Sequence, residues 1–416
     1  MNRNQYILIG PFSEVLTMEG TPLKGALRDS ELKVICDAGI LLDGATIKAI
    51  GNFEVLQHEA KELSATILSI DNDMVLTPGW IDVHTHIAFA GTRAHDFGMR
   101  NAGSSYLEIA ESGGGIWSTV KDTRHASEEE LVFLILKRAN SLIKQGITTI
   151  EVKSGYGLSV EEELKILRAI RRARITCKAT LVPTCLAAHT LPKDYVGTHT
   201  EYLDMIASEL FPILKAEGLT NRIDAFIEKS AFSKAQIEPY FMRAKEMGFD
   251  ITVHADQFST SGSEVAIAFG ARSADHLECS GELEIRQLAA SEVVSVALPG
   301  ASLGIGCAFT PARQLLDAGA SLAIASDWNP GSAPMGQLMT QASILATFEK
   351  LTNAEVFAGL TCRAGAALGM VDRGILAPGY RADFAIYRTA HIEEITYLQG
   401  QMIPEEVWIG GERVLD

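Results

Sequence analysis

Two histidines separated by one residue are the first candidates for chemistry in this chain. His84 and His86 follow the turn signal Pro78-Gly79 and a short apolar run. Because residues i and i+2 of a strand point to the same face, this spacing aims two imidazoles at one point. Neutral imidazole is the commonest protein ligand for metals, so the pair can bind Zn²⁺ or Fe²⁺. Two ligands make only half a site, and a chance pair on a half-buried strand is an equally good interpretation until others are found.

The composition indicates a folded globular protein and argues against a nucleic-acid partner. A length of 416 residues allows one large barrel or two to three ordinary domains. Hydrophobic residues make up 47% of the chain and charged residues 21%, as in globular proteins. A formal net charge of −16 disfavours a polyanionic partner. The N-terminus lacks a leader pattern and no apolar run reaches the roughly 20 residues of a membrane span, so we expect a cytoplasmic protein with no membrane partner. The six cysteines form no CxxC pair, which favours free, mostly buried thiols.

Both ends of the chain show the alternating pattern and the glycine turns of β-hairpins. The pattern covers residues 1 to about 72 and returns in about the last forty residues. Neither segment is large enough to form a stable hydrophobic core alone. We therefore expect residues 1–74 and 371–416 to form one composite β-sandwich domain beside a barrel of residues 75–370.

The segment between these ends alternates apolar strand runs with helices that begin at capping residues. Ser127, Ser159 and Ser233 each precede such a helix, and Pro311 and Gly319 bracket another. Eight parallel strand–helix units form a (β/α)₈ TIM-like barrel, whose active site lies at the C-terminal ends of its strands. Eight apolar strand runs can be counted, near residues 80, 147, 179, 222, 250, 273, 293 and 321.

Functional side chains should therefore lie where the strands end, and five of the ten histidines do so together with one aspartate. A single histidine of this kind is more often a hydrogen-bonded core residue, but the shared placement predicts one polar rim. The histidines at 58, 95, 125, 199 and 391 lack this placement and are interpreted as surface or structural. The six rim residues are His84, His86, His189, His254, His276 and Asp327.

The strand-one segment 78–86 resembles the signature of the metal-dependent amidohydrolase superfamily. His254, His276 and Asp327 fall at the strand five, six and eight positions of that superfamily. Within it, the whole chain resembles the imidazolonepropionase family, whose members hydrolyse a ring amide in histidine degradation. The segments that carry this resemblance are 90–93, 112–116, 151–158, 254–257 and 327–332, of which 151–158 is the most specific.

A single metal ion is the expected cofactor. Two-metal members of the superfamily usually bridge their ions with a lysine or an acid at the end of strand four. Here Glu228 could bind metal, but Lys229 is expected on the other face of a continuing strand, so no bridging lysine is predicted. Nitrogen and oxygen ligands suit zinc and iron alike. In agreement with the resemblance, we expect one divalent or trivalent transition metal ion per chain, with a water molecule, held by His84, His86, His254 and Asp327.

The expected reaction is hydrolysis of a cyclic amide. A bound metal activates water and polarises a carbonyl, and Asp327 and His276 are expected to transfer protons, with a purely structural role as the alternative for His276. Deaminases of the superfamily often carry glutamate where this chain has Gln257. An amide cannot shuttle a proton, which favours ring opening over loss of an exocyclic amine.

The substrate implied by the resemblance is a small anion, 4-imidazolone-5-propanoate, which would yield N-formimidoyl-L-glutamate. The guanidinium of Arg93 follows strand one and matches a carboxylate. Tyr156 and His189 can add hydrogen bonds from neighbouring loops, and Gln257 can read the ring. The resemblance implies three further substrate-binding positions, Asn329, Gly331 and Ser332.

Two other functions stay open at this point. One is another cyclic-amide hydrolase or aminohydrolase on the same barrel. The other, a non-catalytic scaffold, is disfavoured because all four metal ligands are present. The resemblance also implies a homodimer.

Overall fold

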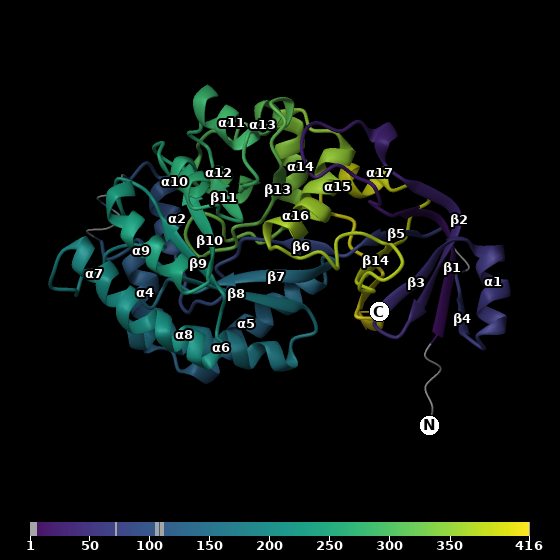
Figure 1. Ribbon diagram of the computed structural model, residues 1–416, viewed down its shortest axis with the longest axis horizontal. Coiled ribbons are helices and arrows are strands. Elements are labelled where there is room, and N and C mark those ends of the chain that lie inside the picture. The colour runs from purple at the N-terminus through teal and green to yellow at the C-terminus, as the bar shows by residue number, and fades with distance from the viewer. Residues whose placement is uncertain (1–5, 71–72, 105–107, 109–111, 416) are drawn as a thin grey trace.

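Eight parallel strands form a nearly closed barrel at the centre of the chain (Figure 1). The computed structural model describes residues 6–70, 73–104, 108 and 112–415. Neighbouring strands follow the chain order, and a parallel bridge between Thr85 and Trp328 joins the segments that follow the first and last strands. The predicted fold class is confirmed, and all eight strand runs are strands: β6 (Trp80–Asp82), β7 (Ile147–Lys153), β8 (Thr180–Ala188), β9 (Arg222–Phe226), β10 (Asp250–Ala255), β11 (Ser273–His276), β12 (Val294–Ala297) and β13 (Leu322–Ile324).

Helices surround the barrel and begin where the capping residues predicted (Figure 1). The first backbone N–H groups of a helix have no partner inside the helix. In α5 and α6, one such group donates a hydrogen bond to the side chain of Ser127 or Ser159. The helices are α2 (Ala94–Asn101), α4 (Ile116–His125), α5 (Glu128–Ile143), α6 (Val160–Thr176), α7 (His199–Met205), the π-helix η2 (Ile206–Leu210), α8 (Phe211–Glu217), α9 (Lys234–Glu246), α10 (Gly262–Ala268), α11 (Glu282–Ala289), α12 (Pro299–Ile305), α13 (Ala312–Asp317), α14 (Leu338–Glu349), α15 (Asn353–Leu360) and α16 (Cys362–Ala367).

Strands from both ends of the chain form a second, mixed sheet with the order β16-β15-β14-β5-β1-β2-β3, in which β4 also pairs with β1. The C-terminal strand β14 pairs antiparallel with β5, directly before the barrel, so the two ends join as predicted. Phe384 and Trp408 stack in the sheet's own apolar core. The elements are β1 (Tyr6–Leu16), the 3₁₀ helix η1 (Asp29–Glu31), β2 (Val34–Asp43), β3 (Thr46–Asn52), α1 (Phe53–Glu62), β4 (Thr66–Ser69), β5 (Val75–Pro78), β14 (Phe384–Tyr387), α17 (Glu393–Tyr397), β15 (Glu406–Ile409) and β16 (Glu412–Leu415).

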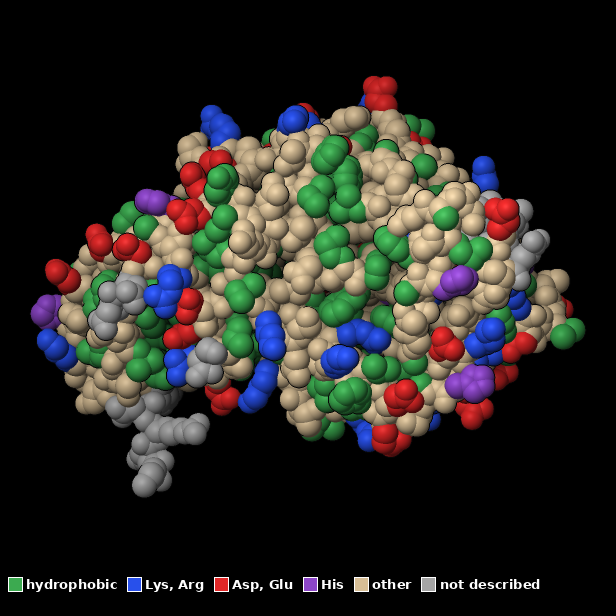
Figure 2. Space-filling view, turned by 180° about the vertical axis from the view of Figure 1, so that it is seen from behind, with side chains coloured by type: hydrophobic (Ala, Val, Ile, Leu, Met, Phe, Trp, Pro, Cys, Tyr) green, Lys and Arg blue, Asp and Glu red, His purple; other side chains and the backbone are tan. Residues whose placement is uncertain are grey.

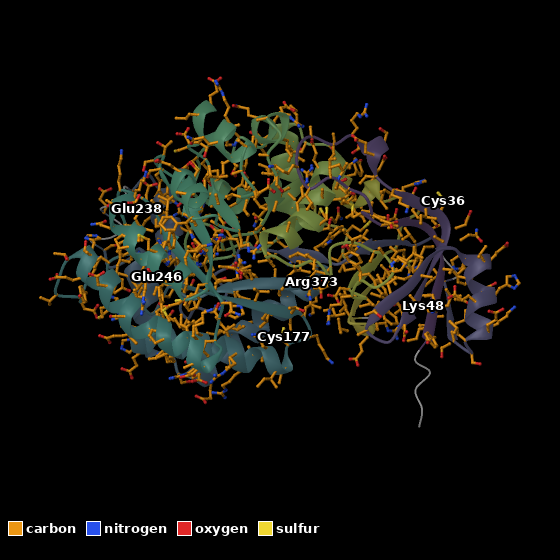
Figure 3. The ribbon with its side chains drawn as sticks, in the orientation of Figure 1. Cys36, Lys48, Cys177, Glu238, Glu246 and Arg373 are labelled. Carbon is orange, nitrogen blue, oxygen red and sulfur yellow. The ribbon has the colours of Figure 1, made fainter. Side chains whose placement is uncertain are left out.

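Buried polar contacts connect the barrel to this terminal sheet. The indole Nε1 of Trp80 in β6 donates to the hydroxyl of Tyr387 at 2.7 Å. Arg373, labelled in Figure 3, donates to the hydroxyls of Thr149 and Thr180 on two barrel strands at 3.1 and 3.0 Å. Because Trp80 begins β6, these contacts help to position the two histidines that follow that strand.

The outer surface mixes acidic, basic and apolar side chains, as one face shows in Figure 2. Histidines 58, 95, 125 and 391 are exposed and His199 is half-buried, in agreement with their predicted surface or structural roles. No helix in the described ranges is long and apolar enough to cross a membrane. The expectation of mostly buried thiols was wrong: Cys185 and Cys362 are buried, whereas Cys36, Cys279 and Cys307 are exposed. Cys279 and Cys307 are exposed because they lie in the loops after β11 and α12.

Candidate metal and substrate site

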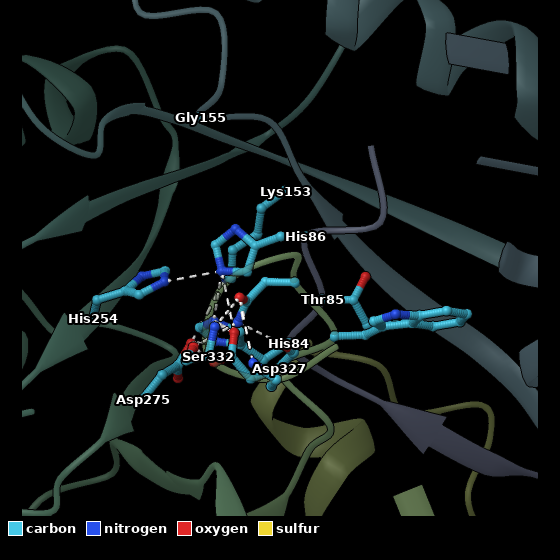
Figure 4. A network of polar contacts seen from close by, with 12 residues as sticks. His84, Thr85, His86, Lys153, Gly155, His254, Asp275, Asp327 and Ser332 are labelled. Carbon is cyan, nitrogen blue, oxygen red and sulfur yellow. Dashed lines mark hydrogen bonds and ion pairs between the residues drawn. The ribbon is translucent and has the colours of Figure 1, made fainter. Parts of the chain in front are cut away.

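The four side chains expected to bind metal meet at the C-terminal end of the barrel (Figure 4). His84 and His86 follow β6, His254 lies in β10, and Asp327 follows β13. Nε2 of His86 lies 3.2 Å from Nε2 of His84 and 3.3 Å from Nε2 of His254. Oδ1 of Asp327 lies 3.5 and 3.4 Å from Nε2 of His84 and of His86. The parallel strand order thus brings together donors from three separate parts of the chain.

This donor set fits a transition metal ion. All four side chains are buried. One ligand atom each of His84, His86 and Asp327 lies within 4.8 Å of the others, as do atoms of His84, His254 and His276. Within the described part of the chain, Oδ1 of Asp327 accepts no hydrogen bond, and a buried carboxylate oxygen ordinarily has a partner. Three imidazoles and one carboxylate are a set that suits zinc and non-haem iron.

Burial keeps the histidines of this cluster in their neutral form. It lowers the pKa of His86 to about 3. It also lowers the pKa of His254 to about 4, although the Asp224 carboxylate acts in the opposite direction. The pKa of His84 likewise lies well below its ordinary value because the ring is buried. A neutral ring offers a nitrogen lone pair, so the cluster can accept a cation without first losing protons.

Two aspartates contact the far side of the histidine rings. Nδ1 of His84 donates to Oδ2 of Asp275 at 2.6 Å. Nδ1 of His254 lies 3.0 Å from Oδ2 of Asp224. A carboxylate at Nδ1 fixes the tautomer of a metal-binding histidine and directs Nε2 toward the ion. These aspartates are not among the predicted site residues, although polar residues inside barrel strands, where apolar ones are usual, were a signal for them.

Lys153 lies among these carboxylates at the end of β7. Its Nζ is 2.8 Å from Oδ2 of Asp224, 3.7 Å from Oδ2 of Asp275 and 2.8 Å from Oε1 of Glu151. Burial opposes a charge on Lys153, but the three carboxylates outweigh it and raise its pKa. The lysine is therefore held as a buried ammonium ion, which the sequence analysis also did not assign.

Two residues of the site have an unusual backbone conformation. Asp327 has φ of 50° and His276 has φ of 86°, in the left-handed region that residues other than glycine seldom adopt. Such conformations persist only where the surroundings enforce them, and they cluster at functional sites. Both residues were predicted to transfer protons, and both lie at strand ends on the same rim.

His276 differs electrostatically from the other histidines of the rim. Its Nδ1 lies 3.4 Å from Oε1 of Glu278. Burial works against a charge on His276, but the carboxylates of Glu278, Asp327 and Asp275 together outweigh it and raise the pKa of the ring. His276 is therefore the rim histidine best able to carry a proton.

A pocket of about 590 Å³ opens over the cluster, a size that fits a small substrate. His86, His254, His276 and Asp327 all line it. Several other wall residues were not predicted, including Arg100 in α2, Phe258 in the loop after β10 and Ile305 at the end of α12. The wall contains all seven predicted substrate-binding residues, namely Arg93, Tyr156, His189, Gln257, Asn329, Gly331 and Ser332.

Two guanidinium groups lie in one wall of this pocket. Nε of Arg93 donates to Oδ2 of Asp96 at 2.9 Å. A Cβ atom on Gly331 would lie 2.3 Å from Nη1 of Arg93, so the absence of a side chain lets the guanidinium approach the loop. Nη2 of Arg100 donates to the carbonyl of Gly331 at 3.3 Å, and burial together with nearby Arg93 lowers the pKa of Arg100. This wall is suited to an anionic group.

The loop after β13 is held by the Asn329 side chain. Its Oδ1 accepts hydrogen bonds from the backbone N–H groups of Gly331 and Ser332 at 2.7 and 2.8 Å. Its Nδ2 donates to the carbonyl of Asp327 at 2.8 Å and to the Ser332 hydroxyl at 2.9 Å. Asn329 lines the pocket, and its side-chain atoms shape the loop that presents Asp327.

Tyr156 and His189 also line the pocket and lie side by side, with ring centroids 5.5 Å apart. Nδ1 of His189 donates to the carbonyl of Gly155 at 2.9 Å, which leaves Nε2 as a hydrogen-bond acceptor. Burial lowers the pKa of His189 to about 3, so the ring is neutral. Gln257, nearly buried, follows His254 at the pocket edge.

The expectation of a continuing strand through Lys229 was wrong. β9 ends at Phe226, because the chain turns there into a loop in which Lys229 lines the pocket. Glu228, which had been considered as a metal ligand, instead accepts hydrogen bonds from the backbone N–H groups of Phe258 and Ser259 at 2.9 and 3.0 Å. Glu228 does not belong to the groups of possible metal ligands found among the described residues.

Comparison with known proteins places this geometry in context. Residues 75–414 match the amidohydrolase family. The chain is 40% identical over 392 residues to an imidazolonepropionase of Acinetobacter baumannii (strain ACICU), covering 94% of this chain and 97% of that protein. It is 41% identical over 391 residues to an imidazolonepropionase of Pseudomonas aeruginosa (strain UCBPP-PA14), covering 93% and 96%. The fold is similar to that of atrazine chlorohydrolase from Arthrobacter aurescens TC1 complexed with zinc, with a TM-score of 0.72, 17% identity and coverage of 99% and 95%.

Proposed function

The chain belongs to the imidazolonepropionase family of amidohydrolases, and we propose how its pocket hydrolyses 4-imidazolone-5-propanoate to N-formimidoyl-L-glutamate in histidine degradation. The observation that carries the proposal is a cluster of three histidines and one aspartate beside a pocket whose wall holds Arg93 and Arg100. The substrate has a ring amide for the cluster and a carboxylate for the two guanidinium groups. Both halves of the site therefore match one small molecule.

One transition metal ion would be held by the four donors at the pocket floor. Such an ion, when bound, polarises an amide carbonyl and lowers the pKa of a water molecule. The donors are Nε2 of His84, His86 and His254 and the Asp327 carboxylate.

Asp327 and His276 move the protons in this proposal. The Asp327 carboxylate, which lines the pocket, accepts a proton from the attacking water. The water oxygen forms a bond to the amide carbon, and the ring C–N bond breaks. The proton then passes to the departing ring nitrogen from Asp327, with His276 on the same rim able to relay it.

Residues of the pocket wall orient the substrate toward Asp327 and His276. Arg93 and Arg100 bind the propanoate carboxylate through charge-assisted hydrogen bonds. Tyr156, His189 and Gln257 supply hydrogen bonds to the ring. Because Gln257 is an amide, it orients the ring without exchanging a proton, which supports ring opening over deamination.

Three finer properties also belong to the proposal. The ion is zinc or iron, which elemental analysis of protein purified without added metal would distinguish. The protein is a cytoplasmic homodimer, which cell fractionation and sedimentation would test. The composite β-domain comprises residues 1–74 and 371–416 and the barrel residues 75–370, a division that limited proteolysis would test.

Turnover of the substrate is the direct test of the function. Purified, metal-loaded protein is mixed with enzymatically prepared imidazolonepropanoate, and loss of its ultraviolet absorbance is followed. We expect loss far above the spontaneous rate, and we expect the rate to scale with protein concentration. Loss at the spontaneous rate, from protein that contains stoichiometric metal, would contradict the proposal.

A further inference from the structure

Lys153 occupies a position in the barrel that ordinarily holds an apolar side chain. Its side chain is completely buried, whereas barrel interiors are usually filled by valine, isoleucine and leucine. A buried ammonium ion is costly unless carboxylates surround it. Glu151, on the same strand, lies 2.8 Å away and supplies one of these carboxylates.

The other two carboxylates come from alternate strands. Lys153 lies on β7, Asp224 on β9 and Asp275 on β11, which are the second, fourth and sixth strands of the barrel. Inward side chains of alternate strands share one layer of a barrel interior. The ammonium Nζ lies 2.8 Å from Asp224 and 3.7 Å from Asp275, so one cation contacts both. This charged layer adjoins the proposed ligands, and Figure 4 draws Lys153 and Asp275 among them.

Each of these aspartates also contacts the ring of one proposed metal ligand. Asp275 accepts the Nδ1 hydrogen bond of His84 at 2.6 Å, and Asp224 lies 3.0 Å from Nδ1 of His254. The same oxygen of each aspartate, Oδ2, lies nearest to both the lysine and the histidine. Movement of the lysine would therefore displace both carboxylates and, through them, both rings.

The layer also reaches the segment between the first two ligands. Glu151, which pairs with Lys153, accepts a hydrogen bond at Oε2 from the backbone N–H of Thr85 at 3.3 Å. The hydroxyl of Thr85 donates to the carbonyl of Glu151 at 2.6 Å. Thr85 lies between His84 and His86, so three of the four proposed ligands have a connection to this layer.

We propose that Lys153 is a positioning residue for the metal site. The lysine holds Asp224 and Asp275 against the Nδ1 atoms of His254 and His84, and it thereby directs the Nε2 atoms of both rings toward the ion. The inference rests on the metal site proposed above and extends it to a side chain outside the predicted ligand and substrate set. It differs from a role in folding alone, because it requires that metal affinity depend on the lysine. Outer partners of metal ligands commonly contribute 10- to 100-fold to affinity.

The test compares two buried cations. Lys153→Met removes the ammonium with little change in volume. The control Arg222→Met removes a buried guanidinium that donates to the carbonyls of Ala367 and Leu368. Zinc affinity is measured by competition with a chromophoric chelator, and the melting temperature of the metal-free protein is recorded. We expect a loss of affinity of at least about tenfold for K153M and less than about threefold for R222M. Equal affinities for K153M and the parent would overturn the inference.

Asp224→Asn keeps the proposal testable even where K153M fails to fold. This variant preserves size, and it is expected to weaken zinc binding by at least about tenfold. Where both fold, K153M/D224N should bind zinc within about threefold of the weaker single variant, because the two residues act through one contact. Unchanged affinity in D224N, or multiplied effects in the double variant, would overturn the inference. A parent that binds no zinc or iron would instead refute the metal site itself.

Discussion

A single methyl group added at Gly331 should displace Arg93 and weaken substrate binding. In Gly331→Ala, the new Cβ would lie 2.3 Å from Nη1 and 2.9 Å from Cζ of Arg93. Ordinary contact begins at 3.4 Å, so the guanidinium must retreat by about 1.1 Å. The obstacle is the end of a flexible side chain and the Gly331 backbone is not left-handed, so the fold should tolerate the change.

The size of the effect follows from the contact that is lost. A hydrogen bond to a charged group contributes about 1.5–3 kcal/mol, and each 1.4 kcal/mol is a factor of ten. We therefore expect KM for imidazolonepropanoate to rise about 10- to 150-fold. We expect kcat to change less than about threefold, because the carboxylate is bound equally in the ground state and the transition state. Initial rates across substrate concentrations measure both constants.

Two comparisons make this prediction refutable. Gly98→Ala adds a methyl group in α2, where nothing lies within 4 Å of the new Cβ, and should leave KM unchanged. Arg93→Met should itself raise KM while metal content stays at the parent level, and adding Gly331→Ala to it should cause no further rise. If G331A alone leaves KM within twofold of the parent, or if it raises KM further in the R93M background, the proposed contact between Arg93 and the substrate is wrong.

Three further outcomes are expected. Asp327→Asn should lower kcat by about 10²- to 10⁴-fold, because the amide cannot accept the proton, and activity close to the parent's would refute that role. Tyr387→Phe should lower the free energy of unfolding by about 1–3 kcal/mol in urea titrations, because Trp80 Nε1 loses its buried acceptor; exposed Tyr397→Phe is the control and should change nothing. Metal removal with a chelator should abolish turnover and lower the melting temperature, and both should return when zinc or iron is restored, since an ion bound to the folded state stabilises it.

The strands and helix starts could be predicted because their signals are local. Apolar runs near residues 80 and 147 became β6 and β7, and Ser127 and Ser159 cap the helices they were expected to start. The convergence of the rim followed from one rule, since parallel strands of a barrel end at the same face. Hence His84, His254 and Asp327 could be placed together without knowledge of any distance.

The charged layer beneath the rim could not be predicted in the same way. Whether Lys153 meets Asp224 depends on the register and tilt of strands two apart in the barrel, which no local pattern contains. The left-handed backbone of Asp327 likewise depends on a tertiary contact, since its N–H donates to the carbonyl of His84 at 3.0 Å. Lys229 was misplaced because the apolar run of residues 225–227 suggested a longer strand than the five residues of β9.

Incorporation of oxygen from water tests the central claim most directly. The metal-loaded protein is incubated with imidazolonepropanoate in H₂¹⁸O. The product is analysed by mass spectrometry well within the half-life of the spontaneous reaction. Hydrolytic opening of the ring amide predicts N-formimidoyl-glutamate with one ¹⁸O atom in the newly formed carboxylate. Release of ammonia from an intact ring, or a product that contains no ¹⁸O, would contradict the account.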